Sequence, residues 1–271
     1  MRAPAAAKIN LALVVGPVRR DGKHEVATVL QRVDLVDRVS IDSARELSVD
    51  GYAGDTLVER ALRLLADAAG VEPRWAARIE KCIPVAAGLG GGSSDAATAL
   101  RLANEALKRP LALDALRAIA LGLGADVSFF LVPGPHLGRG DGSELHRLEL
   151  PQDYWVVLCL PDGQAKASTA SVYDAFDSRG GEQGFEERRA ALLEALDRVR
   201  RPRDLAVLPG NDLASSPLAD ELRELGAFRA DVSGAGPAVY GLFSAEADAR
   251  AAEQALRARG RTWICVPAWY G

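Results

Sequence analysis

The sequence predicts an α+β protein built in two halves, and three observations lead to this prediction. Strand-like and helix-like segments alternate irregularly along the chain. The 271 residues allow one large or two modest domains, and their 48% hydrophobic content is ordinary for a globular protein. A fresh apolar run, YWVVLCL at 154–160, follows Pro151. We therefore expect an N-terminal domain at 1–150 and a C-terminal domain at 151–271.

In the first half, turn signals and hydrophobic spacing define the expected elements in order. The apolar run Ile9–Val15 ends at Gly16-Pro17 and predicts a strand. The charged segment 19–24 centres on Asp21-Gly22 and predicts a hairpin tip. Further strands are expected at Val26–Val36, Arg38–Ile41 and Trp75–Cys82. Helical spacing predicts helices at Thr56–Ala69, at 96–107 and at Asp114–Leu121, which end at Gly70, at Pro110 and at Gly122 with Gly124.

The second half is expected to contain further strands and helices. Strand-like runs lie at 154–160, 238–243 and 261–266. Helical patterns lie at 186–200, 218–225 and 246–257. The segment Asp177–Gly184 combines charges with three glycines, and this composition predicts a mobile surface loop.

Composition argues against several classes of function. The net charge of −4 gives no general attraction for phosphate backbones, so we do not expect nucleic acid as a partner. The longest stretch without Asp, Glu, Lys or Arg is Val232–Ala245, 14 residues, whereas a membrane span needs about 18. The first residues lack the apolar run of a signal peptide, and Cys82, Cys159 and Cys265 lie far apart. We therefore expect a cytoplasmic protein with reduced, buried thiols.

The strongest local signal is the segment 88–94, GLGGGSS, which opens onto a helical pattern. Glycines let backbone N–H groups approach a polyanion, and a helix N-terminus adds unpaired donors and partial positive charge. Ser93 and Ser94 add hydroxyls for phosphate or a bound divalent cation. The spacing excludes a dinucleotide-binding G-x-G-x-x-G motif and a Walker A loop. A flexible linker or close helix packing is the alternative interpretation, but a phosphate cradle explains the pattern better.

Three motifs, in order along the chain, resemble those of the GHMP kinases (galactose, homoserine, mevalonate and phosphomevalonate kinases and their relatives). They are Ala7–Leu11, Pro84–Ser94 and Val232–Pro237. Further segments resemble the members that phosphorylate 4-diphosphocytidyl-2-C-methyl-D-erythritol: Arg20–Glu25, Gly90–Ala97, Gly124–Phe130, Asn211–Leu213 and Ser233–Gly236. The resemblance implies a two-domain α+β fold with the active site in the cleft between the domains.

The resemblance also implies an activity, which is transfer of the ATP γ-phosphoryl group to the acceptor 2-hydroxyl in non-mevalonate isoprenoid synthesis. Asp126 matches the acidic residue that takes the hydroxyl proton, and Lys8 matches the lysine beside it. ATP with Mg²⁺ is implied as cofactor, with no metal ligand assigned. The implied ATP-binding residues are Pro84, Val85, Ala86, Ala87, Gly88, Leu89, Gly90, Gly91, Gly92, Ser93 and Ser94. The implied substrate-binding residues are Asn10, Lys23, His24, Thr169, Gly234 and Gly236.

Departures from the family pattern bear on the substrate more than on the reaction. Lys23 stands where the family usually has a Tyr that stacks on the nucleobase. Ala6, Ser128 and Ala214 replace other usual residues, but none of these changes removes a catalytic group. Two alternatives therefore stay open: a GHMP kinase for another small alcohol, such as homoserine, mevalonate or a sugar, and a non-catalytic nucleotide-binding module. Monomer and homodimer are both compatible with the sequence.

Overall fold

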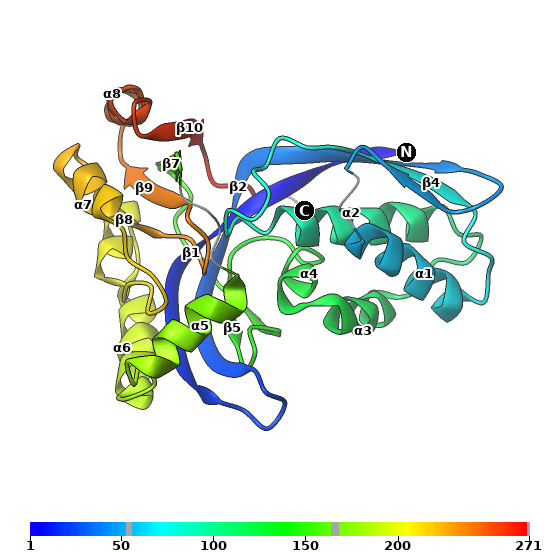
Figure 1. Ribbon diagram of the computed structural model, residues 1–271, viewed down its shortest axis with the longest axis horizontal. Coiled ribbons are helices and arrows are strands. Elements are labelled where there is room, and N and C mark those ends of the chain that lie inside the picture. The colour runs from blue at the N-terminus through cyan, green and yellow to red at the C-terminus, as the bar shows by residue number, and fades with distance from the viewer. Residues whose placement is uncertain (53–55, 164–167, 270–271) are drawn as a thin grey trace.

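The computed structural model describes residues 1–52, 56–163 and 168–269. It shows two lobes side by side, each a β-sheet with helices packed on it (Figure 1). The first sheet has the strand order β3-β4-β2-β5-β6, with β1 paired to β2. The second has the order β10-β7-β9-β8. This arrangement confirms the expected α+β class. The first sheet ends at Arg147 and the second begins at Trp155, and the exact domain boundary stays a prediction.

The long hairpin of β1 (Arg2–Val18) and β2 (His24–Ser43) is the backbone of the first lobe. The expected tip at 19–24 lies between them. We expected β2 as two strands with a break at Asp37, but the ladder continues there, with Asp37 opposite Ala5. The buried Asp37 carboxylate has hydrogen-bond partners just after the strand Trp75–Glu80, where it accepts hydrogen bonds from the backbone N–H groups of Cys82 and Ile83.

Four helices cover one face of the first sheet in the described part of the chain. They are α1 (Leu57–Ala69), α2 (Gly91–Glu105), α3 (Leu113–Leu123) and α4 (Ala125–Phe129). α1 buries Val58, Ala61, Leu62, Leu65 and Ala66, the one-sided pattern of an amphipathic helix. Small residues let α2 run close beneath the hairpin, where Ala96, Ala97, Ala99 and Ala103 are buried. The remaining strands of this lobe are β3 (Ser48–Asp50), β4 (Trp75–Glu80), β5 (His136–Arg139) and β6 (Glu144–Arg147).

The second sheet is apolar on both faces because helices cover one face and the hairpin covers the other. Its strands are β7 (Trp155–Pro161), β8 (Arg229–Val232), β9 (Val239–Phe243) and β10 (Gly260–Cys265). On β7, Val156 and Leu158 pack toward the hairpin, whereas Val157 and Cys159 pack toward α7 and α8. The helical segments of this lobe are α5 (Thr169–Ser178), α6 (Phe185–Arg198), η1 (Pro202–Val207), α7 (Pro217–Glu224) and α8 (Glu246–Leu256).

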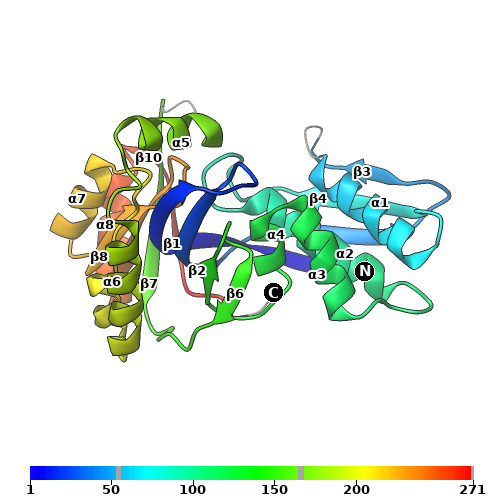
Figure 2. The same ribbon diagram turned by 90° about the horizontal axis from the view of Figure 1, so that it is seen from below.

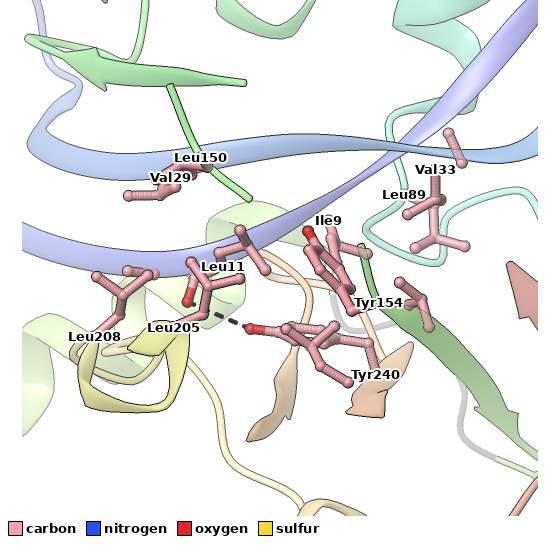
Figure 3. Packing of buried hydrophobic residues seen from close by; sticks show 14 of the residues in the cluster. Ile9, Leu11, Val29, Val33, Leu89, Leu150, Tyr154, Leu205, Leu208 and Tyr240 are labelled. Carbon is pink, nitrogen blue, oxygen red and sulfur yellow. Dashed lines mark hydrogen bonds between the residues drawn. The ribbon is translucent and has the colours of Figure 1, made fainter. Parts of the chain in front are cut away.

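A shared core joins the two lobes (Figure 3). Ile9 and Leu11 of β1 pack against Tyr154 and Tyr240 from the second lobe, and the Tyr240 hydroxyl donates to the Leu11 carbonyl at 3.3 Å. Backbone hydrogen bonds between Leu13 and residues 210 and 212 extend this contact along the outer edge of β1. β1 is therefore a structural part of both lobes.

Some local expectations were wrong. Gly122 lies inside α3, and the helix ends at Gly124. The expected loop at Asp177–Gly184 begins within α5, whose last residues are Asp177 and Ser178. Cys82 is exposed, although Cys159 and Cys265 are buried as expected. The helices of the described residues are all too short or too polar to cross a membrane.

Candidate active site

A cavity of about 790 Å³ opens between the two lobes. Its walls come from β1 and β2, the loop before α2, α4, the β5–β6 turn, one face of α5 and the segment after β8. In Figure 2, α5 lies beside the β1–β2 hairpin, and Leu13 and Val15 of the hairpin pack against Phe176 of α5. The cavity thus brings together segments that lie far apart in the sequence.

Lys8 and Asn10 face this cavity because alternate residues of β1 point to opposite sides of the sheet. Their neighbours Ile9 and Leu11 point into the core shared by the two lobes. The Lys8 Nζ atom donates to Asn10 Oδ1 at 2.6 Å, and Asn10 Nδ2 donates to Thr28 Oγ1 at 2.7 Å. This buried chain of hydrogen bonds fixes the lysine side chain in one orientation.

Asp126 lies in the first turn of α4, where its Oδ2 atom is 3.6 Å from Lys8 Nζ. The side chain of Asp126 is 37% exposed, whereas that of Lys8 is 6% exposed. The Asp126 carboxylate is therefore accessible from the cavity and lies beside a fixed ammonium group.

The glycine-rich segment forms a tight loop at the N-terminus of α2. Gly88 and Gly90 adopt left-handed backbone conformations, with φ of 83° and 69°, which glycine accepts without strain. The Lys8 N–H donates to the Leu89 carbonyl at 2.9 Å, so the loop is tied directly to β1. Gly91, Gly92 and Ser93 of the first turn of α2 line the cavity, and N–H groups of a first helical turn have no intrahelical partner, as a phosphate site requires.

The segment after β8 packs directly on this glycine-rich loop. A Cβ atom at Gly236 would lie 2.2 Å from the backbone of Ala87, so a side chain there would displace the loop. Ser233 Oγ donates to the Gly88 carbonyl at 3.0 Å. Gly234 lies against Lys8, because a Cβ atom there would be 3.5 Å from Lys8 Nζ. The second lobe thus closes one side of the cavity.

His24 also lines the cavity, and its ring is held by residues of α5. His24 Nε2 lies 2.8 Å from Asp177 Oδ1, and its ring centroid lies 4.7 Å from that of Tyr173. Burial raises the pKa of Tyr173 to about 12, so its hydroxyl stays protonated at neutral pH.

Lys23 is paired across the hairpin tip with Asp141 of the β5–β6 turn. Ser143 Oγ also donates to the Asp141 carboxylate, at 2.6 Å. Burial opposes ionisation of Asp141, but the hydrogen bonds from Lys23 and Ser143 outweigh it and lower the pKa of Asp141. An ion pair therefore occupies the position at which we expected Lys23 alone.

Comparison with known proteins agrees with this geometry. The models of the N-terminal and C-terminal domains of the GHMP kinases match residues 56–134 and 213–262. A 4-diphosphocytidyl-2-C-methyl-D-erythritol kinase from Anaeromyxobacter sp. (strain K) is 40% identical over 95% of this chain and 85% of its own length. The chain belongs to this GHMP kinase family. A homologue of the same name from Bacillus pumilus (strain SAFR-032) is 38% identical over 93% of this chain and 91% of its own length.

Solved structures of GHMP kinases share the fold along nearly the whole chain. A crystal structure of 4-(cytidine 5'-diphospho)-2C-methyl-D-erythritol kinase superposes with a TM-score of 0.80, at 33% identity, and covers 99% of both chains. A mevalonate kinase superposes with a TM-score of 0.79 at 15% identity, again over 99% of both chains. At that low identity, the second match demonstrates the common fold alone.

In this GHMP kinase, the residues proposed from sequence lie around one cavity, with a single exception. Lys8, Asn10, Lys23, His24, Asp126, Thr169, Gly234, Gly236 and residues 84–93 all line it. Ser94 does not, because it lies in the first turn of α2 with its side chain turned into the protein, 1% exposed. The catalytic and binding roles of these residues are proposed below.

The sequence analysis missed several residues that line the cavity of this GHMP kinase. Lys81 Nζ contacts Asp37 Oδ2 at 2.5 Å and Asp95 Oδ2 at 2.7 Å, next to the glycine-rich loop. The position of Lys81 between a predicted strand and Pro84 of the glycine-rich motif could have indicated that it lies at the site. Tyr173 and Asp141 gave no such signal, because only the packing of α5 and the β5–β6 turn brings them to the site.

Proposed function

We propose that this protein transfers the γ-phosphoryl group of ATP to the 2-hydroxyl of 4-diphosphocytidyl-2-C-methyl-D-erythritol. The observation that carries the proposal is the Lys8–Asp126 pair, 3.6 Å apart, in a cavity that also contains a glycine-rich phosphate loop. The names of the relatives supply the acceptor, and the family resemblance of the sequence motifs supplies the isoprenoid context. The reaction consumes ATP, and we place it in the cytoplasm.

Phosphoryl transfer depends on positioning and charge stabilisation more than on covalent chemistry. In this proposal, the backbone N–H groups of Gly88–Ser93 bind the ATP phosphates at the N-terminus of α2. The acceptor hydroxyl lies between the γ-phosphate and Asp126. Asp126 Oδ2 takes the hydroxyl proton as the new O–P bond forms, while the bond between the γ-phosphorus and the β–γ bridging oxygen breaks and ADP leaves. Lys8 Nζ stabilises the negative charge that develops on the attacking oxygen.

A magnesium ion is the expected partner of the ATP phosphates. Mg²⁺ in such sites takes one or two protein oxygens and completes its shell with phosphates and water. Ser93 presents a hydroxyl oxygen to the cavity, so the described residues fit this requirement without a preformed acidic cage. When bound, the ion neutralises charge on the β- and γ-phosphates.

The cytidine end of the acceptor is proposed to lie at the His24 end of the cavity. His24 supplies ring nitrogens, Tyr173 supplies an aromatic face, and the Lys23–Asp141 pair supplies a donor and an acceptor. An amino group of cytosine pairs well with a carboxylate, whereas the carbonyl that replaces it in uracil does not. The ion pair therefore gives a polar contact in place of the aromatic residue that is usual at position 23.

The deciding experiment measures ADP release by the purified protein with Mg-ATP and each of four acceptors. These are 4-diphosphocytidyl-2-C-methyl-D-erythritol, homoserine, mevalonate and galactose. Turnover with the cytidylylated acceptor alone supports the proposal. Turnover with another acceptor instead supports the proposed kinase activity and rejects the proposed substrate. ATP binding without turnover on any acceptor identifies a non-catalytic module.

Lys23→Ala tests the placement of the cytidine. We expect the KM for the cytidylylated acceptor to rise about tenfold, the size of one lost charged contact, while the KM for ATP stays within twofold. Steady-state kinetics with each substrate varied in turn provides both values. Arg20→Ala is the matched control, since Arg20 is an exposed cation of the same turn that does not line the cavity. An equal rise in both KM values would contradict this placement.

A further inference from the structure

Arg32 is a fully buried arginine at the centre of the first lobe, with 0% of its surface exposed. It lies on β2 directly opposite Lys8 of β1 in the antiparallel ladder. Directly opposed residues project to the same face of a sheet, and two like charges in this arrangement repel each other. Lys8 is compensated by Asp126, whereas no carboxylate of the described residues forms an ion pair with Arg32. The protein therefore keeps a costly buried cation next to its catalytic lysine.

The guanidinium of Arg32 is directed against α4, the helix that carries Asp126. Its Nη2 atom donates to the Phe129 carbonyl at 2.6 Å, and Phe129 is the last residue of α4. Its Cζ atom lies 4.5 Å from the ring centroid of Phe129 and 5.5 Å from that of Phe130. A cation at a helix C-terminus and over aromatic rings is favourably placed.

This arrangement keeps Arg32 charged despite its burial. Burial, with a smaller contribution from Arg101, lowers the pKa of Arg32 to about 10, which still leaves it protonated at neutral pH. Its Nε atom has no hydrogen-bond partner in the described part of the chain. An apolar side chain of similar volume would fill this space without the cost of desolvation. Packing alone therefore does not explain an arginine here.

The contacts of Arg32 continue to both members of the catalytic pair. The Phe130 N–H donates to the Asp126 carbonyl at 3.2 Å, which closes the turn of α4. The Phe130 ring lies beside the Lys8 stem, because a Cβ atom at Gly90 would be 3.0 Å from both Phe130 Cε2 and Lys8 Cγ. A shift of α4 would thus move Asp126 and loosen the packing around Lys8 at the same time.

We propose that Arg32 is a positioning residue for phosphoryl transfer. Its guanidinium holds the C-terminal end of α4 and so keeps Asp126 at a fixed distance from Lys8. It touches neither substrate, since it does not line the cavity. The inference rests on the proposed kinase activity, and it predicts that loss of Arg32 affects the chemical step rather than the binding of ATP.

The test compares Arg32→Met and Arg32→Lys with the wild-type protein in the ADP-release assay. For Arg32→Met we expect kcat to fall tenfold or more, with the KM values for ATP and acceptor within twofold. Arg32→Lys keeps a donor and a charge near the Phe129 carbonyl and should recover at least a third of the wild-type kcat. Leu222→Ala on α7 is the control for lost stability, because Leu222 is fully buried in the other lobe, away from the site.

Three outcomes would overturn the proposal: a kcat for Arg32→Met within twofold of wild type, a parallel rise of both KM values without a change in kcat, or the same loss of kcat in Leu222→Ala. If Arg32→Met does not fold, Arg32→Lys is judged by the same kcat and KM criteria. A kcat reduced threefold or less supports the proposal, and a larger reduction of kcat in a folded protein rejects it. The kcat and KM values of each variant are divided by those of the wild-type protein. A wild-type protein inactive on every acceptor would reject the kinase activity itself, which separates that failure from failure of the Arg32 proposal.

Discussion

The two lobes bury polar groups in different ways. In the first lobe, charged side chains such as Lys8, Arg32 and Asp37 lie beneath the surface next to the cavity. The second sheet fills both faces mostly with apolar residues, and its buried Arg229, which donates to the backbone carbonyls of residues 205, 208 and 209, does not line the cavity. The first lobe accepts the cost of buried charge where chemistry needs fixed charges, and the second lobe supplies packing, one face of α5 and the loop after β8.

Asp126→Asn tests the first side of this comparison and has the largest expected effect. The amide cannot accept the acceptor proton, so kcat should fall by about 10²-fold or more, the range of general base catalysis. ATP affinity should change little, because Asp126 is proposed to act on the hydroxyl. ADP release and nucleotide binding by calorimetry provide the two values.

Asp114→Asn is the control for this change. Asp114 is an exposed carboxylate in the first turn of α3, with a side chain that is 93% exposed. Its kinetics should match wild type. Near-normal turnover of Asp126→Asn would remove the proposed base from the mechanism.

Gly236→Ala tests whether the second lobe contributes only packing. The added Cβ would lie 2.2 Å from the Ala87 backbone, so the glycine-rich loop must shift. We expect kcat/KM for ATP to fall about tenfold to 100-fold, since misplacement of about 1 Å at a reacting group costs up to about 10²-fold.

Gly122→Ala is the matched control, because it lies inside α3 with open space around its added Cβ. It should leave the kinetics unchanged and raise the free energy of unfolding by up to about 1 kcal/mol. If Gly236→Ala also had wild-type kinetics, the segment after β8 would have no part in positioning ATP.

Tyr240→Phe tests the contribution of the second lobe to stability. The Tyr240 hydroxyl donates to the Leu11 carbonyl and accepts from Arg229 Nε at 3.2 Å, so its loss leaves two buried groups unpaired. Urea unfolding should show a loss of about 1–2 kcal/mol with no change in kcat. Tyr154→Phe is the control, since its buried hydroxyl has no hydrogen-bond partner among the described residues. Equal destabilisation by both changes would contradict this account.

The smallest effect is expected from His136 of the first lobe. Burial lowers the pKa of His136, against a smaller opposing effect of its hydrogen bond to the Gly134 carbonyl. As the pH falls below about 6.5, the unfolded chain takes up this proton first, so the folded state loses stability. Urea unfolding at pH 7.5 and 5.5 should show a smaller decline for His136→Gln than for wild type. His146→Gln, at an exposed position, should decline as wild type does.

Local patterns carried most of what the sequence could predict. The loop at 88–94, Lys8 and the amphipathic α1 depend on residues close together in the chain, and the structure places the first two at one cavity. The edge strand β8 was missed because it is only four residues long, although Arg229-Ala230-Asp231-Val232 does alternate polar and apolar side chains.

Residues that depend on tertiary packing were beyond reach. The sequence predicts a strand around Arg32, but nothing in it reveals that this arginine is fully buried beneath α4. In the same way, Asp141 reaches Lys23 only through pairing of β5 with β2. Such contacts arise from segments about a hundred residues apart, which hydrophobic periodicity does not relate.

The place of β1 in both lobes has a consequence for biosynthesis. The face of β1 that carries Leu11 is covered only after Tyr240, 229 residues later, has been synthesised. At about 5–20 residues per second, a ribosome needs roughly 10–45 s to supply that partner. During that time, β1 exposes an unpaired edge and an apolar face. The nascent chain is therefore a natural client for a chaperone until Tyr240 has been synthesised.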